Sequence, residues 1–394
     1  MKILFVSPYP PAKDGLASYT KLLVGQLRSE GCEVTVVGTR TLASGDSDAS
    51  SSLGLNIRRL YAAVGTARPD VVHIQYTIAS FGLIALSMWV VLGMAKVRLR
   101  TKLVVTFHEV KRETALLYGL GALYYRLMGG IADSVTVHTH EAVELLVDRC
   151  HIARHKIHYV PHPLYVNSVW SVSPSTIREK YGLERKRVIL FFGYIHVDKG
   201  IDHLLSAFSL ARRLEPRMTE TRLVIAGSVR PRRPGLLKIF EKRDCKYRDK
   251  LHAMVDTFGL TDSVQFVPYV PEHQIGEWFR SASVVVMPYT RIEQSGVLNI
   301  ALTCRTPIIA SRLGGFAETL SGTNALVTPG DEMELAEKII LVLTDELVSR
   351  SLVEEYDAIC RERTIEAVTT RLLEIYRGAP FAGIACQGCG RDSA

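Results

Sequence analysis

Residues 187–214 read RVILFFGYIHVDKGIDHLLSAFSLARRL, an apolar run followed by a short loop and a segment of helical length. The run ends at Gly193, and Lys199 and Gly200 open the helical segment. This order predicts a buried strand that turns into a helix. Because a helix start carries partial positive charge and free N–H groups, a lysine beside it indicates a phosphate site. A surface lysine in an ordinary strand-to-helix turn is the alternative interpretation.

Similar apolar runs alternate with helical segments along most of the chain. The runs are KILFVSP, EVTVVG, DVVHIQY, KLVVTFH, SVTVHTH and KIHYVPH in the first 165 residues, and RVILFFG, RLVIAGS, SVQFVPYV, SVVVMPY, TPIIASR and ALVTPG after residue 185. Runs that are apolar on both faces are typical of parallel strands between helix layers, and their spacing fits βαβ units. We therefore predict an α/β fold with two doubly wound sheets.

A mixed polar stretch, residues 164–186, separates the two groups of runs. We place an N-terminal Rossmann-like domain at residues 1–170 and a C-terminal Rossmann-like domain at 185–360. A C-terminal helix at 361–378 is expected to pack back toward the N-terminal domain, and 379–394 to form a flexible tail.

Charge and cysteine content narrow the function classes. The net charge of +8 favours an anionic partner, which includes nucleic acid, acidic lipid and phosphorylated small molecules. Seven cysteines, an odd number, argue against a disulfide framework, and the lone pair Cys386 and Cys389 lacks the further ligands of a zinc site. The first residues do not resemble a signal peptide, so we expect a cytoplasmic protein.

Two segments raise the question of membrane contact. Residues 78–95 carry no charge, which predicts a buried helix, a helix in the membrane surface or, at the lower length limit, a spanning helix. Residues 230–250 hold nine Lys or Arg against three acids, typical of a solvated insertion or a membrane contact. Aromatic residues are too sparse there to favour nucleic acid, so no nucleic-acid partner is expected.

A second loop pattern, after the run SVVVMPY, carries further candidate ligand groups. Ser295 and Gly296 open a helix, and the backbone N–H groups of Ser295, Gly296 and Val297 are placed to hold a phosphate. Glu293 and Glu318 are carboxylates near the same sheet edge, where a solvated loop position is the alternative for each.

The ordered set FFG-x5-KG, VIAG, VQFVPYV, PYTRIEQSGV and A-x5-PIIAS-x2-GG-x2-E resembles the donor-binding domain of retaining GT-B glycosyltransferases of family 4. SPYPPAKDGLASYTKLLVGQL, DVVHIQY, TFHEV and KIHYVPH are similar to the N-terminal half of that family, so the resemblance covers about residues 1–375. It implies two Rossmann-like domains that face a central cleft, an acceptor-binding domain at residues 1–170 and a nucleotide-sugar-binding domain at 185–360. It also implies transfer of a sugar, with retention, from a nucleoside-diphosphate donor to a hydroxyl acceptor.

The resemblance also implies roles for single residues. Lys199 matches the lysine that binds the donor diphosphate, and His108 matches a histidine near the transferred sugar; these are the catalytic candidates. The implied donor-binding residues are Gly15, Gly193, Lys199, Tyr269, Val270, Glu293, Ser295, Gly296 and Val297. No metal is expected, and no cofactor is expected besides the nucleotide sugar. His73 is expected inside the sheet, whereas His138, His140, His158 and His162 stand at strand ends without an assigned role.

The chain departs from the family pattern at one phosphate cation. Many members have an arginine directly after the glycine of the first motif, and Tyr194 stands in that place here. Arg230 and Arg291 are candidates for the missing positive charge.

A second departure concerns the family's pair of glutamates. Ile292 and Ile300 stand where the two glutamates would be, and Glu293 lies one position from the first. The second glutamate usually holds the ribose, so the sequence offers no group for that contact.

The predicted function is therefore a metal-independent, retaining glycosyltransferase in polysaccharide, glycolipid or natural-product biosynthesis. The acceptor hydroxyl is unknown. The basic charge favours a lipid-linked acceptor, with peripheral contact at the inner face of the cytoplasmic membrane. A sugar-nucleotide epimerase and a non-catalytic binding protein of the same fold are the alternatives. A dinucleotide oxidoreductase is rejected because the first loop lacks G-x-G-x-x-G.

Overall fold

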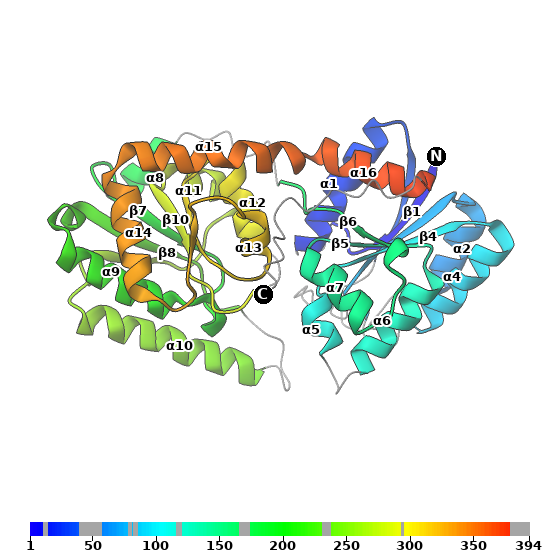
Figure 1. Cartoon of the computed structure of the whole chain (residues 1–394), viewed down its shortest axis with the longest axis horizontal. Coiled ribbons are helices and arrows are strands. Elements are labelled where there is room, and N and C mark those ends of the chain that lie inside the picture. The colour runs from blue at the N-terminus through cyan, green and yellow to red at the C-terminus, as the bar shows by residue number, and fades with distance from the viewer. Residues whose placement is uncertain are drawn as a thin grey trace, which may run out of the picture.

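The computed structural model describes residues 1–10, 15–38, 57–77, 81, 86–115, 120–164, 174–230, 238–292 and 295–378. Its strands form two six-stranded parallel sheets, one in each lobe of the molecule (Figure 1). Sheet A comprises β1 (Lys2–Ser7), β2 (Glu33–Gly38), β3 (Val71–Tyr76), β4 (Lys102–Phe107), β5 (Ser134–Val137) and β6 (Ile157–Tyr159). Sheet B comprises β7 (Arg187–Phe192), β8 (Thr221–Ala226), β9 (Val264–Val267), β10 (Val284–Met287), β11 (Ile308–Ser311) and β12 (Leu326–Val327). Each of the twelve apolar runs contains one strand, which confirms the predicted α/β class.

Strand order decides where a ligand can bind. Sheet A runs β2-β1-β3-β4-β5-β6, and sheet B runs β12-β11-β10-β7-β8-β9. In sheet B the order reverses between β7 and β10, whose register pairs Val284 with Ile189. At such a reversal the loops after the two strands diverge, and α/β proteins bind ligands there, at the carboxyl ends of the strands. The loops that follow β7 and β10 are therefore the first place to look for a site.

Helices pack on both sheets. In the first lobe they are α1 (Gly15–Ser29), α2 (Ile57–Ala67), α4 (Leu86–Leu99), α5 (Val110–Thr114), α6 (Leu120–Ile131) and α7 (His140–Asp148). In the second they are α8 (Pro174–Lys180), α9 (Ile201–Leu214), α10 (Lys238–Thr257), α11 (Ile275–Ser281), α12 (Gly296–Thr303), α13 (Gly314–Thr319), α14 (Glu332–Thr344) and α15 (Glu346–Glu362). Four 3-10 turns complete the described elements: η2 (Arg154–Lys156), η4 (Val197–Lys199), η5 (Pro216–Glu220) and η6 (Glu272–Gln274).

The last helix, α16 (Ile365–Arg377), follows α15 along the top of the molecule and lies beside α1 of the first lobe (Figure 1). Its apolar side chains Leu372 and Tyr376 are buried in one core cluster with Phe5 and Tyr19. The chain therefore returns to complete the core of the domain in which it began.

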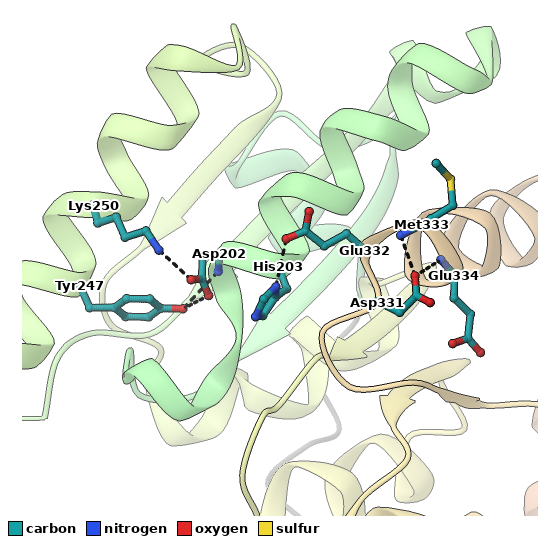
Figure 2. A network of polar contacts seen from close by, with 8 residues as sticks. All are labelled: Asp202, His203, Tyr247, Lys250, Asp331, Glu332, Met333 and Glu334. Atoms are coloured by element: carbon teal, nitrogen blue, oxygen red, sulfur yellow. Dashed lines mark hydrogen bonds and ion pairs between the residues drawn. The ribbon is translucent and has the colours of Figure 1, made fainter.

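Helix α9, which begins directly after Lys199 and Gly200, is held from both sides (Figure 2). Asp202 accepts hydrogen bonds from the Tyr247 hydroxyl at 2.7 Å and from the Lys250 ammonium at 2.9 Å, which ties α9 to α10. On the other side, His203 Nδ1 lies 3.0 Å from a carboxylate oxygen of Glu332, at the start of α14. Although burial works to raise the pKa of Asp202, these donors lower it overall. Polar contacts thus fix the helix that follows the candidate lysine.

The uncharged segment 78–95 lies partly outside the described residues. Helix α4 begins at Leu86 and continues to Leu99, so Lys96 and Arg98, which follow the uncharged segment, lie in its last turn. Met88 and Leu92 are buried, whereas Val90 is exposed. The simple prediction of a buried helix is therefore wrong for its outer face. No described helix is both long and apolar enough to cross a membrane.

The basic stretch 230–250 also becomes mainly helix, since α10 begins at Lys238, while residues 231–237 lie outside the described residues. The pair Cys386 and Cys389 lies outside them as well. The five described cysteines form no disulfide.

Gly200 provides a test of how tightly the loops of sheet B pack. Its φ is +59°, and a Cβ there would lie 2.0 Å from the carbonyl oxygen of Pro288. Gly182 has a similar φ of +65° with open space around it. We expect Gly182→Ala to cost only the left-handed strain, about 1–2 kcal/mol, and Gly200→Ala to add a steric cost of about 1–3 kcal/mol. Thermal and urea unfolding of the two variants measure the difference, and equal midpoints would show that the loops can separate freely.

Candidate functional site

Four loops lie side by side at the carboxyl edge of sheet B. The Gly227 amide after β8 donates to Val267 O at 2.8 Å, and the Gly193 amide after β7 donates to Ala226 O at 2.9 Å. On the other side of β7, the amide of Thr290 after β10 donates to Asp198 O at 3.0 Å. The loops after β9, β8, β7 and β10 therefore form one connected rim.

Glycines allow parts of this rim to touch backbone to backbone. A Cβ on Gly227 would lie 1.8 Å from Gly193 O, so the loops after β7 and β8 cannot be this close with any larger residue. A Cβ on Gly193 would lie 3.8 Å from a methyl of Val297, which places the β7 loop beside the start of α12. The structure thus brings Gly193 and Val297, two of the predicted donor-binding residues, into one site.

Lys199 ends the turn η4, and its ammonium lies 3.7 Å from the centroid of the Tyr289 ring. Burial, together with the nearby positive charge of Arg230, lowers the pKa of Lys199 to about 8, against a smaller opposite effect of Asp198. No carboxylate among the described residues forms an ion pair with Lys199. A half-buried ammonium with an aromatic ring below it and a second cation nearby is well suited to bind an anion.

The second cation, Arg230, lies near Tyr194, which stands in the place of the family's arginine. The guanidinium of Arg230 lies 4.5 Å from the centroid of the Tyr194 ring, the residue in the place of the family's arginine. Arg230 follows β8 rather than β7, yet it stacks on this tyrosine and influences Lys199. Arg291, the other candidate, is tied through its amide to Asp198 O at 3.4 Å. Of the two arginines, Arg230 is the one with a side-chain contact at this position.

The start of α12 completes the anion-binding groups. Ser295 is the N-cap of α12, and its hydroxyl accepts from the amide of Leu298 at 3.4 Å. The first amides of a helix have no intrahelical partner, so those of Gly296 and Val297 are available at the rim. Glu293, predicted to contribute here, lies outside the described residues, as does its neighbour Gln294.

The other predicted donor residues lie further along the edges. Tyr269 and Val270 follow β9, where Tyr269 is 75% exposed and Val270 is half-buried. Gly15 is the first residue of α1, in the loop after β1. Ile300, at the place of the family's second glutamate, packs against the core of the second lobe. No group of three or more His, Cys, Asp or Glu in the described part of the chain could hold a metal ion.

His108 lies at the carboxyl edge of sheet A within a connected set of histidines. Its Nε2 is 2.6 Å from Gln75 Oε1, and its Nδ1 is 3.2 Å from His138 Nε2. His138 Nδ1 is in turn 2.8 Å from the carbonyl oxygen of Val160. Burial, with the neighbouring histidines, lowers the pKa of His108 well below its usual value and that of His138 to about 3. Both rings are therefore neutral at physiological pH.

Neutral rings determine which atoms carry protons. Val160 O can only accept, so His138 carries its proton on Nδ1 and accepts from His108 Nδ1–H. His108 Nε2 is then an acceptor, which requires the Gln75 side chain to present its NH2 group. The oxygen and nitrogen of a side-chain amide exchange places by a half-turn, and the hydrogen-bond network decides between them. The Gln75 oxygen then faces His73 Nε2, at 3.4 Å, as an acceptor.

The network continues to the end of the chain, because His73 Nδ1 is hydrogen-bonded to the hydroxyl of Tyr376 on α16. His73 is fully buried, as expected from the sequence, and burial lowers its pKa to about 3. A neutral His73 that accepts from Tyr376 at Nδ1 carries its proton on Nε2, which lies 2.7 Å from the Thr106 hydroxyl and 3.4 Å from the Gln75 side chain, so Thr106 is the main acceptor. His73 therefore links Tyr376 on α16 to the edge of sheet A, where Gln75 and His138 hold the His108 ring.

Three contacts join the edges of the two sheets. Asn299 Nδ2, on α12, lies 2.9 Å from His162 Nδ1, which follows β6. Arg363, only 5% exposed, donates to Thr319 of the second lobe at 2.9 Å and to the hydroxyl of Tyr159 of the first at 3.5 Å. His162 thus lies at the boundary between lobes, and the carboxyl edges of both sheets meet there.

The third contact is made by Glu318 of α13. Its two carboxylate oxygens accept from the amides of His140, at 2.7 Å, and Glu141, at 2.9 Å. These are the first two residues of α7, whose N-cap is Thr139. A carboxylate at a helix N-terminus is stabilised by both hydrogen bonds and the helix dipole. Glu318 is therefore an interdomain contact rather than the solvated loop residue considered from sequence.

Comparison with known proteins agrees with this arrangement. The family model of glycosyltransferase family 4 matches residues 13–167, and that of glycosyl transferases group 1 matches residues 174–363. The two matches together include almost all strands of both sheets. The chain belongs to glycosyltransferase family 4.

Curated relatives are glycosyltransferases and synthases. A D-inositol 3-phosphate glycosyltransferase of Thermomonospora curvata is 30% identical over 212 residues, 51% of this chain and 45% of the relative. A mannosylfructose-phosphate synthase of Agrobacterium fabrum is 28% identical over 209 residues, 52% of this chain and 43% of the relative. The family 4 chain thus spans less than half the length of these relatives.

Solved structures show the same fold at low identity. HepE of Anabaena, in complex with UDP-glucose, aligns with a TM-score of 0.68 and 17% identity over 96% of this chain and 100% of that one. A UDP-forming α,α-trehalose-phosphate synthase of Burkholderia xenovorans, in complex with glucose-6-phosphate, aligns with a TM-score of 0.71 and 12% identity over 96% and 100%. The GT-B fold predicted for this chain is thereby confirmed.

Glu318 provides a test of the domain contact. In Glu318→Ala the two α7 amides lose their acceptor, a loss of about 1 kcal/mol that shifts the balance toward separated domains by about fivefold. Small-angle X-ray scattering should show a larger radius of gyration. Glu355 is the matched control, because its carboxylate accepts from the backbone amide and side chain of Asn324 within one domain. An equal change in Glu355→Ala, or none in Glu318→Ala, would contradict the assignment.

Proposed function

We propose that this family 4 glycosyltransferase transfers a sugar from a nucleoside-diphosphate donor to a hydroxyl acceptor, with retention and without a metal. The observation that carries the proposal is the environment of Lys199, an ammonium placed over the Tyr289 ring and beside Arg230 without an acidic partner among the described residues. An excess of positive charge at the point where the strand order of sheet B reverses favours binding of an anionic ligand. A diphosphate provides the charge that both cations and the start of α12 can share.

Positive charge at the rim also suits the proposed chemical step. When the bond between the anomeric carbon and the phosphate oxygen breaks, its electron pair stays on the nucleoside diphosphate. Lys199, Arg230 and the first amides of α12 stabilise that growing charge without reorganisation. The acceptor oxygen attacks the anomeric carbon and its proton passes to the departing phosphate. Attack on the face that the phosphate leaves gives retention and requires no carboxylate nucleophile.

His108 has a different part in the proposal from Lys199. A neutral imidazole cannot compensate phosphate charge, so the diphosphate depends on the cations of the second domain. Gln75 and His138 contact both ring nitrogens of His108 and so hold the ring in one orientation, and a hydrogen bond from the sugar to Nε2 would replace the contact with Gln75. We assign it to positioning of the transferred sugar, near the acceptor.

The known complexes suggest which donor to test first. HepE was crystallised with UDP and with UDP-glucose, so a uridine donor is the first choice for this chain. We propose a hydroxyl acceptor from polysaccharide, glycolipid or natural-product biosynthesis, lipid-linked and used at the inner face of the cytoplasmic membrane. A thermal-shift screen against sugar nucleotides identifies the donor, because a ligand of the folded state raises the unfolding temperature. Product analysis without acceptor then separates the alternatives. Hydrolysis of the sugar nucleotide indicates a transferase, an epimerised sugar nucleotide indicates an epimerase, and unchanged sugar nucleotide indicates a binding protein.

Lys199→Met should lower turnover of the donor identified by that screen by about 100- to 1000-fold, as expected when one charge-stabilising donor is lost. Lys180→Met is the matched control, since the Lys180 ammonium also lies over a tyrosine ring, 5.3 Å from the centroid of Tyr181, but outside the rim. Release of the nucleoside diphosphate is measured for both. Full activity of Lys199→Met would overturn the assignment of the phosphate site.

Arg230→Ala should weaken binding of the nucleoside diphosphate about tenfold, because a charge-assisted contact of a guanidinium is lost. Arg291→Ala should have a smaller effect. Adding Tyr194→Arg to Arg230→Ala should restore affinity, since it returns a cation to the same position from β7. Isothermal titration with the diphosphate tests all three variants. Equal losses in Arg230→Ala and Arg291→Ala would contradict a special role of Arg230.

A further inference from the structure

The outer surface of α4 and α6 carries two rows of exposed apolar side chains. The rows are Val90, Met94 and Val97 on α4, and Leu120, Leu123 and Leu127 on α6. We call this surface the α4–α6 face. Within each row the residues are three or four positions apart, as required for one side of a helix. Val97 is 81% exposed and Leu120 is 60% exposed, so these side chains are not the edge of a core.

The two helices lie side by side in parallel. Trp89 Nε1 donates to the hydroxyl of Tyr124 at 3.2 Å, and about two helical turns further along, the Lys96 ammonium donates to Ile131 O at 2.8 Å. In both contacts the second residue is 35 positions after the first. This constant offset means that α4 and α6 run in the same direction with their rows in register.

Helical geometry directs both rows to the same side. Val90 follows Trp89 by one residue, a rotation of about 100°, and Leu123 precedes Tyr124 by one residue, a rotation of about 100° in the opposite sense. Trp89 and Tyr124 face each other between the helices. Because α4 and α6 are parallel and adjacent, these opposite rotations direct Val90 and Leu123 to the same surface. That surface faces away from the buried side chains of the two helices, which cover sheet A. The rows therefore form one continuous apolar face.

Charge on this face has a single sign. Neither α4 nor α6 contains Asp or Glu, whereas Arg98 and Arg126 are exposed and Arg100 follows α4 directly. Lys96 is paired with Asp133, at 2.7 Å. Exposed apolar rows flanked by unopposed arginines are typical of helices that lie in the interface of an anionic membrane. A second copy of the chain would bring the same positive charges together, which disfavours self-association through this face.

We propose that the α4–α6 face docks on an anionic lipid bilayer, with the two apolar rows in the headgroup region and Arg98, Arg100 and Arg126 among the lipid phosphates. Docking itself is independent of the sugar-transfer chemistry. It places the first domain on the membrane through an outer layer of helices, so the loops of sheet B remain in solution.

The position of the face fits the proposed lipid-linked acceptor, a step that rests on the proposed function. Helix α6 begins against α5, where a Cβ on Gly121 would lie 2.0 Å from Glu113 O. Helix α5 begins at Val110, two residues after His108. The apolar row on α6 therefore begins next to the edge of sheet A at which His108 stands. A lipid-anchored hydroxyl would have a short path from the bilayer to this edge.

Co-sedimentation of the full chain with vesicles tests the proposal. Wild-type protein should bind vesicles that contain phosphatidylglycerol at least about tenfold better than vesicles of phosphatidylcholine alone, and high salt should weaken this binding. Val97→Glu combined with Leu123→Glu should lower the affinity for the anionic vesicles at least about tenfold. Leu347→Glu is the matched control, because Leu347 is 76% exposed on α15, in the other domain, and this variant should bind as wild type does.

Donor-dependent thermal shift and donor hydrolysis in solution separate docking from folding and from the proposed function. Both should be unchanged in the doubly substituted variant. Equal vesicle binding by this variant and the wild type, or equal binding to both kinds of vesicle, would overturn the proposal. So would a wild-type dimer that the double substitution converts to a monomer, because the face would then be a contact between copies. Loss of activity in Lys199→Met with normal vesicle binding would leave the docking proposal intact.

Discussion

The candidate site depends on contact between backbones at the carboxyl edge of sheet B. Gly227 lies against the carbonyl of Gly193, and Gly200 lies against the carbonyl of Pro288. No side chain separates the loops after β8, β7 and β10, so they behave as one rim. The left-handed conformation of Gly200 ends the turn that carries Lys199 and opens α9, whose contacts with α10 and α14 then hold it in place. The position of the ammonium is thus a consequence of where two glycines, Gly227 and Gly200, permit close approach.

The positive charges on this rim are electrostatically unfavourable in the protein without a ligand. Lys199 is half-buried over an aromatic ring, and Arg230 adds positive charge nearby. The pKa of Lys199 is therefore lower than that of a lysine exposed to water. Charge that is unfavourable without ligand becomes favourable when an anion arrives, which is a physical indication of a binding site rather than of a structural ion pair. Structural ion pairs in this chain are different: Lys250 with Asp202 and Lys96 with Asp133 each combine a cation with a carboxylate.

The structural features that could be predicted from sequence are those determined by residues close together in the chain. Buried parallel strands need apolar residues on both faces, so all twelve runs were visible, and a helix start next to a lysine identified the turn at Lys199. Other contacts join distant positions and leave no local pattern. Glu318 and His140 are 178 positions apart, and His73 and Tyr376 are 303 apart. Arg230 reaches the place of the missing arginine from another strand, which spacing alone could not distinguish from Arg291.

The facing edges of the two sheets differ in charge. The rim of sheet B concentrates positive groups, while the edge of sheet A presents His108, His138 and His162, all with pKa values lowered by burial. Under the proposed function, a phosphate is therefore drawn to the rim of sheet B, and the sugar meets neutral side chains of fixed orientation at the edge of sheet A. Tyr376 couples this second side to the last helix, which reaches it only after the chain has completed sheet B. The orientation of His108 thus depends on completion of both domains, so a chain that had folded only one of them would lack the full site.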